Sequence, residues 1–350
     1  MLGYARIDTI FGDDQYKVVE FNSRRPQMYE DADWFSRYLD SISGDENIIK
    51  EENGLEIVKS IHIQFKINSK KVDPENIVVL NNFPNQKYTF SSINILKNYF
   101  SKSNIYFFTC KEIKGFYQEI ENISGEIIYK GKRIDLIIIQ SICGNASLFT
   151  KSGGIRIPEI RESFNQNKIE LYTLPSGQIS GTKLSLDLLQ NKEIQFKINL
   201  SLDEINAVQT IPYSIHSENI ADFRNYNKDD YVLKLTGLGQ GLGVKLGINM
   251  HLNDWLDLLH KYADKNEKFL LQEKINLAPK EILNLHTLEF EKAFITLEPF
   301  VVNNPLEYTE PKVSGYASRA IPIHLHQEGM KFNPAYDKSE IYFGALISEI

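Results

Sequence analysis

Three short, almost wholly apolar runs constrain the fold of this 350-residue chain more than any other feature. They occupy residues 76–80, 104–110 and 133–139, and stretches long enough for a helix separate them. Strands that are apolar on both faces are typical of a parallel sheet with helices on each side, joined by right-handed crossovers. We therefore expect residues 46–150 to form an α/β unit whose ligands gather beyond the carboxyl ends of its strands.

A glycine-rich segment joins two further predicted strands. Residues 231–235 and 244–248 alternate between apolar and polar side chains, and the segment between them contains Gly237, Gly239, Gly241 and Gly243. The backbone amides of such a loop can approach phosphate groups closely because no Cβ atoms intervene. The spacing fits neither the Walker loop nor the dinucleotide fingerprint, and both of those motifs open a helix, whereas this loop returns as a strand. The pattern predicts a flap over a nucleotide.

Lys234 lies on the strand that enters this flap, at a place that suits contact with a phosphate. The alternative is a loose surface hairpin with a solvated lysine. Each glycine costs backbone entropy, roughly 0.5–1 kcal/mol in the interior of an element, so a loop this rich in glycine is seldom only a turn. We therefore favour phosphate contact.

The first 22 residues predict a hairpin with a polar face. The turn at residues 12–14 separates a strand that contains Arg6 and Asp8 from one that contains Glu20 and Asn22. Because side chains alternate along a strand, these four can share one face of the hairpin. Two carboxylates and an amide oxygen are ligands that Mg²⁺ accepts together with nucleotide phosphates, and a neighbouring arginine can stabilise phosphoryl charge. The alternative is a half-exposed hairpin whose carboxylates face water.

The composition argues against several classes of protein. A net charge of −7 provides no basic stripe for general nucleic-acid binding. Cys110 and Cys143 lie in apolar surroundings without metal-ligand spacing, which is typical of reduced cysteines in a cytosolic protein. No apolar run approaches the roughly 20 residues of a membrane helix, and the first residues lack a signal-peptide pattern. We therefore expect a cytoplasmic protein that binds neither nucleic acid nor membrane.

The order of these motifs resembles the circularly permuted ATP-grasp family, which includes glutathionylspermidine synthetase. The motifs are Arg-x-Asp, x-Glu-x-Asn, a lysine-bearing strand before a glycine flap, and Leu-Leu-Gln-Glu at residues 270–273. The resemblance implies an α+β and α/β protein, with an ATP-grasp fold in circularly permuted order and a Rossmann-like parallel-sheet substrate domain. The implied parts are metal-binding strands with a first helix (1–45), the substrate domain (46–150), a connecting segment (151–230), an ATP-binding lobe (231–300) and a return segment (301–350).

The resemblance also implies roles for individual residues, with ATP and Mg²⁺ as cofactors. The Mg²⁺ ligands would be Asp8, Glu20 and Asn22. The catalytic residues would be Arg6, which steadies the transferring phosphoryl group, together with Lys234 and Arg319. The nucleotide would contact Lys192, Lys234, the flap glycines Gly237, Gly239, Gly241 and Gly243, and the hinge residues Gln272, Glu273, Lys274 and Ile275.

The implied activity is that of an ATP-dependent carboxylate–amine ligase, which forms a C–N bond through an acyl phosphate. Its substrates would be a small-molecule or peptide carboxylate and an amine acceptor. Family members carry a region before the first metal strand that this chain lacks, so that part of the substrate site is either missing or supplied by a partner protein or a second copy. Two alternatives remain open: an inactive nucleotide- or peptide-binding module, and a phosphotransferase to a hydroxyl acceptor.

Overall fold

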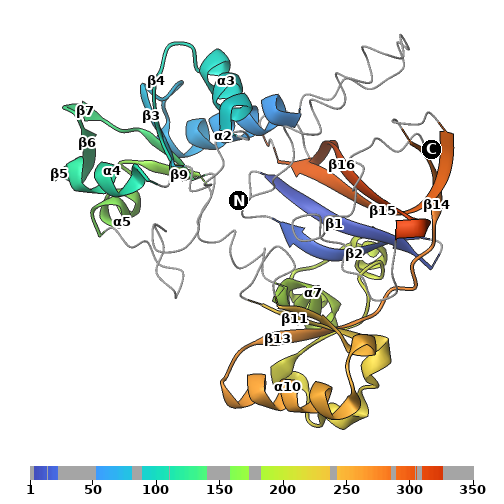
Figure 1. The fold of residues 1–350 in the computed structure, drawn as a ribbon. Coiled ribbons are helices and arrows are strands. Elements are labelled where there is room, and N and C mark those ends of the chain that lie inside the picture. Colours follow the sequence, from blue (N-terminus) through green and yellow to red (C-terminus); the bar gives the residue numbers. More distant parts are fainter. Residues whose placement is uncertain are drawn as a thin grey trace. The chain divides into compact units, whose positions relative to one another are not determined.

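The computed structural model describes residues 4–13, 15–22, 53–80, 89–109, 111–139, 158–172, 183–236, 243–284, 289–303, 305 and 310–325. The chain forms two compact units. Unit 1 contains Met1–Arg6, Asn22–Ile179 and Phe300–Tyr316, and unit 2 contains Ile7–Phe21, Ser180–Pro299 and Ala317–Ile350. Parallel and antiparallel sheets both occur, so the chain has a mixed α/β fold (Figure 1). Among the described residues, no helix has the length and apolar character that crossing a membrane requires.

Unit 1 is built on the parallel sheet that the apolar runs predict. Its strands are β3 (Asn76–Leu80), β4 (Asn104–Phe108), β8 (Leu136–Ile139) and β9 (Glu170–Tyr172). They lie in the order β4-β3-β8-β9, and every pair is parallel. The fourth strand comes from the 151–230 segment, which the resemblance assigns to a connection. The residues that directly follow the carboxyl ends of β3 and β8, where we expect ligands, lie outside the described part of the chain.

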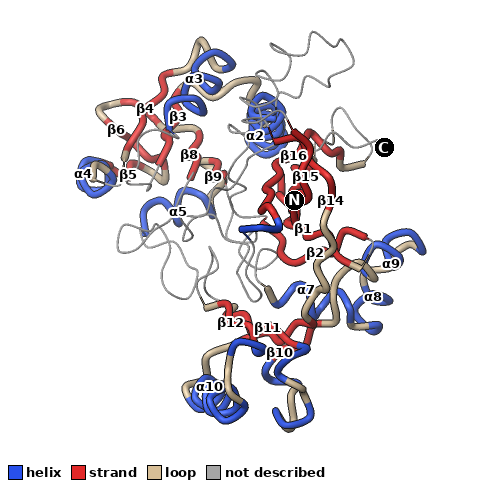
Figure 2. Tube along the Cα trace, turned by 45° about the vertical axis from the view of Figure 1, so that its right-hand side comes forward, coloured by secondary structure: helices blue, strands red, loops and turns tan. Residues whose placement is uncertain are grey.

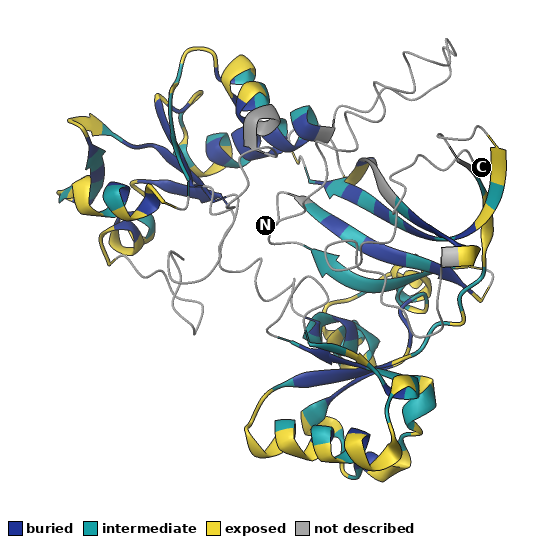
Figure 3. Ribbon diagram, in the orientation of Figure 1, coloured by how far each residue is buried: buried dark blue, intermediate teal, exposed yellow. Residues whose placement is uncertain are grey.

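Helices cover both faces of this sheet. Its strands β3, β8 and β9 are buried along their length, whereas the edge strand β4 is only partly buried (Figure 3). Successive residues of β3 enter different cores, as the period of two requires. Ile77 and Val79 pack with α2 (Asn53–Ser69) and α3 (Thr89–Tyr99), whereas Val78 and Leu80 pack with α4 (Ile113–Glu119) and α5 (Pro158–Asn165). Beyond α4, β5 (Ile120–Ile123), β6 (Glu126–Tyr129) and β7 (Lys132–Arg133) form a small antiparallel sheet.

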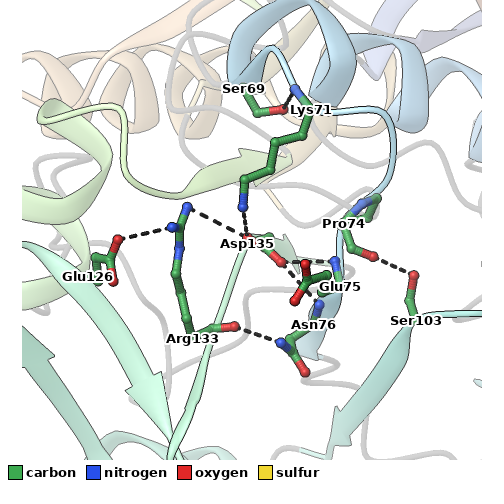
Figure 4. A network of polar contacts seen from close by, with 9 residues as sticks. All are labelled: Ser69, Lys71, Pro74, Glu75, Asn76, Ser103, Glu126, Arg133 and Asp135. Atoms are coloured by element: carbon green, nitrogen blue, oxygen red, sulfur yellow. Dashed lines mark hydrogen bonds and ion pairs between the residues drawn. The ribbon is translucent and has the colours of Figure 1, made fainter.

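A buried carboxylate joins the amino ends of the parallel strands (Figure 4). Asp135, which precedes β8, is only 4% exposed. Its carboxylate accepts hydrogen bonds from Lys71 Nζ at 2.6 Å, from the Glu75 N–H at 2.9 Å and from the Asn76 N–H at 3.2 Å. The side chain of Asn76 in turn donates to the Arg133 carbonyl at 2.9 Å. These contacts hold β3 and β8 together at their amino ends.

Replacing Asp135 with alanine should lower the free energy of unfolding by about 2–4 kcal/mol, because the Lys71 ammonium and the N–H groups of Glu75 and the buried Asn76 lose their acceptor. Urea denaturation measures this loss. The control is Glu126→Ala, which removes the Arg133 partner at 3.0 Å, where both side chains are about one-third exposed. It should cost less than about 1 kcal/mol. Equal losses in the two variants would show that the Asp135 contacts do not stabilise the sheet.

The hairpin predicted at the start of the chain is present. Its strands β1 (Tyr4–Gly12) and β2 (Gln15–Asn22) are neighbours in a sheet that also contains β14 (Lys280–Asn284), β15 (Glu289–Val302) and β16 (Lys312–Pro322). Asp13, in the turn, has a positive φ of 50°. The order is β14-β15-β1-β2, with β16 paired to β15. The two strands of the hairpin pass from unit 1 into unit 2 after Arg6 and back again after Phe21.

A second, antiparallel sheet in unit 2 carries the lysine strand (Figure 2). Its order is β10-β13-β11-β12, formed by β10 (Ser214–His216), β13 (Phe269–Glu273), β11 (Tyr231–Leu235) and β12 (Val244–Leu246). Leu233 and Phe269 pack on one face with Trp255 of α10 (Leu252–Asp264). Leu270 packs on the other face with Leu186 of α7 (Leu184–Gln190). The other helices among the described residues are α8 (Lys192–Lys197), α9 (Leu202–Val208), and the 3₁₀ turns Ser217–Asn219, Phe223–Asn225, Lys228–Asp230, Gly247–Asn249 and Ile323–Leu325.

Gly12 allows the end of β1 to approach the segment after β13. A Cβ atom on Gly12 would lie 2.3 Å from Ile275 Cγ2 and 2.5 Å from the Asn276 carbonyl oxygen. The Asp13 N–H donates to that same carbonyl at 3.1 Å, so the backbone cannot move apart without losing this bond. A side chain at this position would therefore force the two segments apart.

Replacing Gly12 with alanine should destabilise the protein by about 1–3 kcal/mol, the usual cost of forcing extra atoms into a packed site. Thermal unfolding and urea denaturation measure the change. Gly115→Ala is the control, since a Cβ atom there meets nothing within 4 Å and Gly115 lies in α4. Alanine favours a helix over glycine, so this control should leave stability unchanged or raise it. A harmless Gly12→Ala would mean that the close approach is not required.

Candidate functional site

The site centres on Lys234, the fourth of the five residues of β11. Leu233 and Leu235 pack against α10. Because side chains alternate along a strand, Lys234 between them projects from the opposite face of the sheet. The ammonium Nζ donates to Gln272 Oε1 at 2.6 Å and to the Val19 carbonyl oxygen at 3.1 Å. Lys234 on β11 therefore contacts both its neighbour β13, in the β10-β13-β11-β12 sheet, and the main chain of β2.

Three charged side chains, those of Glu20, Lys183 and Asp8, surround this ammonium. Burial lowers the pKa of Lys234 to about 8, while the nearby carboxylate of Glu20 raises it, the positive charge of Lys183 lowers it, and the carboxylate of Asp8 raises it. Asp8 and Lys183 are 9% and 5% exposed, so they lie in a largely water-free environment. Electrostatic interactions are stronger there than at the surface. The structure thus brings together two acidic and two basic side chains that are up to 226 residues apart in the sequence.

Lys183 is a member of this cluster that the sequence analysis missed. Its Nζ lies 3.2 Å from Glu20 Oε1, in an ion pair between the residue before α7 and β2. The available signal was its place immediately before the apolar residues that form α7. Lys192, which the resemblance suggested for the nucleotide, is exposed at the first position of α8 and takes no part in these contacts. Its assignment to the nucleotide remains a prediction.

The predicted Mg²⁺ ligands are distributed over neighbouring strands. Asp8 lies on β1, and Glu20 and Asn22 lie on β2. The carboxylates of Asp8 and Glu20 both raise the pKa of Lys234, and all three residues belong to unit 2. Asn22 and the buried Arg6 belong to unit 1. Their places relative to the cluster therefore remain predictions. Within the described residues, no group of three histidine, cysteine, aspartate or glutamate side chains is arranged to hold a metal ion.

The chemistry of the cluster fits a magnesium nucleotide. Carboxylate oxygens are hard donors of the type that Mg²⁺ binds together with phosphate oxygens. An ammonium has three N–H donors, and Gln272 and Val19 are the two hydrogen-bond acceptors that Lys234 meets among the described residues. The third donor suits a phosphate oxygen.

The backbone N–H groups of two predicted hinge residues, Glu273 and Lys274, already donate hydrogen bonds to backbone carbonyls. The Glu273 N–H donates to the Tyr213 carbonyl at 2.8 Å, and the Lys274 N–H donates to the Asp230 carbonyl at 2.7 Å. Contact with an adenine through either of these N–H groups would require that bond to open. Ile275 lies next to Gly12.

Arg319 on β16 forms an ion pair with Glu298 on β15. Glu298 is fully buried, and its carboxylate also accepts a hydrogen bond from Thr296 Oγ1 at 3.2 Å. One role of Arg319 is therefore to neutralise a buried carboxylate, and its catalytic role remains a prediction. Of the flap, Gly237, Gly239 and Gly241 lie outside the described residues. Gly243 ends the flap with a φ of 75°, a conformation that favours glycine.

The sheets of the two units define a mixed α/β protein, and the charged cluster lies in unit 2. Among solved structures, the chain is similar to a glutathione synthetase-like effector, GSS30, from Globodera pallida in its apo form. The TM-score is 0.59 and the identity 15%, over 92% of this chain and 73% of that chain. At this identity the likeness shows a shared fold. The sequence matches no protein-family model and no curated protein.

Two other solved structures show weaker likeness. A putative γ-glutamylcysteine synthetase from Methylobacillus flagellatus KT has a TM-score of 0.49 and 11% identity, over 97% of this chain and 80% of that one. A D-alanine–D-alanine ligase from Bacillus anthracis, complexed with ATP, has a TM-score of 0.30 and 10% identity, over 69% and 85%. Both TM-scores lie below 0.5, so neither likeness supports a conclusion.

Proposed function

We propose that this protein is an ATP-dependent ligase that joins a carboxylate to an amine. Its ATP-grasp fold would run in circularly permuted order, with the metal-binding strands first in the chain. The observation that carries the proposal is the convergence of Asp8, Glu20, Lys183 and Lys234 in unit 2. The cysteine content suits a reducing compartment such as the cytoplasm.

Each residue of the cluster, and each of the predicted residues Arg6 and Asn22, would have a role in this chemistry. Asp8, Glu20 and Asn22 would hold Mg²⁺, which neutralises phosphate charge and orients the phosphates when it is bound. Lys183 and Lys234 would bind phosphate oxygens, and Arg6 would stabilise the charge that develops on the transferred phosphoryl group. The buried position of Lys183 and Lys234 excludes water around them. No nucleophile from the protein is required.

The proposed reaction has two steps. An oxygen of the substrate carboxylate attacks the γ-phosphorus of ATP, and the bond to the β–γ bridging oxygen breaks, which yields an acyl phosphate and ADP. The amine nitrogen then attacks the acyl carbon, inorganic phosphate leaves, and the nitrogen loses a proton. The amide product therefore forms with one ATP converted to ADP and phosphate.

Measurement of ADP release with panels of carboxylates and amines tests the proposal. Turnover that needs both a carboxylate and an amine, with an amide product in the mass spectrum, is the expected result. Turnover with a hydroxyl acceptor and no amine would identify a phosphotransferase. Binding of ATP without turnover across the panel would identify a nucleotide-binding module. Either of the last two results overturns the ligase proposal.

Lys183 and Lys192 are alternative candidates for the second lysine that, with Lys234, binds phosphate. We expect Lys183→Met to weaken binding of the magnesium complex of ATP about 10- to 100-fold, the range for a lost hydrogen bond to a charged group. Lys192→Met should change the affinity far less, because Lys192 is exposed on α8. Isothermal titration calorimetry measures both. The reverse order of effects would return the role to Lys192.

A further inference from the structure

The side chain of Gln272 contacts the lysine at the centre of the site. The resemblance assigns this residue to the hinge through its backbone, yet its amide is only 2% exposed and faces the cluster. Gln272 Oε1 accepts from Lys234 Nζ at 2.6 Å, and Gln272 Nε2 donates to Ser214 Oγ at 3.0 Å. Both ends of the amide are therefore used.

Ser214 fixes which end of the amide meets the lysine. Its hydroxyl, which is also buried, donates to the Pro212 carbonyl at 2.8 Å and so has only its lone pairs left for Gln272. An acceptor at that point selects the NH₂ end of the amide, and the oxygen must then face Lys234. If the amide were turned round, two donors would face each other at Lys234 and two acceptors at Ser214.

A third residue holds Ser214 in place. Gln190, at the end of α7, accepts from the Ser214 N–H at 2.9 Å. Its amide nitrogen donates to the Ile211 carbonyl at 2.8 Å and to the Pro212 carbonyl at 3.1 Å. The chain of contacts therefore runs from the lysine of β11 through β13 and β10 to the end of α7.

We propose that Gln272 is a positioning residue: its amide, oriented by Ser214, holds the Lys234 ammonium where its third N–H meets a nucleotide phosphate. This inference rests on the proposed nucleotide site and names the side chains that prepare it. An amide suits the role because it accepts a hydrogen bond without a full negative charge. The positive charge of Lys234 thus remains available for phosphate, which an aspartate or glutamate in this place would partly cancel.

A double-mutant cycle with Lys234 tests the inference. We expect Gln272→Met to weaken binding of magnesium–ATP by about tenfold or more, which corresponds to one charged hydrogen bond. Ser214 bonds to Gln272 and reaches Lys234 only through it, so Ser214→Ala should weaken ATP binding several-fold. Ser214→Thr keeps the hydroxyl and should therefore bind ATP as wild type does. In a Lys234→Met background, Gln272→Met should have little further effect, since the residue acts through the lysine. Effects that add in the double variant would overturn the proposal.

A second measurement separates this inference from the proposed function. The ¹H–¹⁵N spectrum of lysine ammonium groups, recorded without nucleotide, should contain a signal of a held ammonium that Lys234→Met removes. Ser214→Ala should shift or broaden that signal, and Ser214→Thr should preserve it. If no variant or wild-type protein binds ATP but the signal behaves in this way, the nucleotide function fails and the positioning role of Gln272 stands. A signal unchanged in both Gln272→Met and Ser214→Ala overturns the positioning role itself. Circular dichroism confirms that each variant is folded.

Discussion

Replacing Asp8 with asparagine is expected to lower turnover by at least about 10²–10³-fold, the range for loss of a group that stabilises transition-state charge. The two side chains have nearly the same shape, so the packing of β1 should survive. Asparagine carries no charge, and it therefore binds Mg²⁺ far more weakly than a carboxylate does. Higher Mg²⁺ concentrations should recover part of the activity. Steady-state rates of ADP release at several Mg²⁺ concentrations measure both effects.

Asp13→Asn is the matched control for this prediction. It makes the same substitution five residues later, at an exposed position in the turn after β1. Asp13 has a φ of 50°, a conformation in which asparagine is well tolerated, so stability should be preserved. Turnover should stay within about twofold of wild type, as for most exposed substitutions away from a site. A comparable loss of activity in both variants, or none in Asp8→Asn, would remove Asp8 from the metal site.

Glu20 is a less direct test of metal binding than Asp8. Its carboxylate pairs with the buried ammonium of Lys183, so a neutral residue at position 20 leaves that charge without its partner. The loss of one member of a fully buried ion pair costs about 3–5 kcal/mol, and this pair should cost less because the Glu20 side chain is 26% exposed. Lost activity in Glu20→Gln would therefore combine metal binding with reduced stability. Asp8→Asn is preferable because it leaves the Lys183–Glu20 pair intact.

The sheet of unit 1 was predictable because its central strands are apolar on both faces. Four consecutive residues, Leu136 to Ile139, leave no choice of exposed face. The edge strand β9 was harder to place, since it is three residues long and begins with Glu170. Burial raises the pKa of this carboxyl group, and Asn68 donates a hydrogen bond to it at 3.0 Å. A sequence cannot show that a glutamate will find such a partner 102 residues away.

Sequence reasoning reached those residues of the candidate site that a local pattern marks. Lys234 is marked by the glycine flap that follows it, and Asp8 and Glu20 by the alternation in a hairpin. Lys183 has no such context, because its burial depends on the meeting of α7 with β2. The side-chain role of Gln272 depends on the register that sets Ser214 opposite Gln272 across β10 and β13. Local patterns cannot reveal contacts that tertiary structure creates.

Lys234→Met should change how the stability of the protein depends on pH. The folded-state pKa of Lys234 is about 8, below its ordinary value of 10.5. Between these values the folded protein has released this proton while the unfolded chain still binds it, so the free energy of unfolding rises with pH. Below pH 8 both states carry the charge, and the folded state bears the cost of burying it. Relative to Lys234→Met, wild type should therefore gain about 3 kcal/mol between pH 8 and 10.5.

Urea denaturation of both proteins across this pH range measures the difference between their free energies of unfolding. Most other titrating groups contribute equally to both proteins and therefore cancel in this difference. Lys261→Met, at an exposed position of α10, is the control and should follow wild type. The same lysine should make nucleotide binding dependent on pH, because phosphate favours the protonated form. Above pH 8, binding of ATP should weaken and should take up a proton, which calorimetry in buffers of different ionisation enthalpy detects. If the free energy of unfolding and the ATP affinity have the same pH dependence in wild type and Lys234→Met, Lys234 is not a buried cation that binds phosphate.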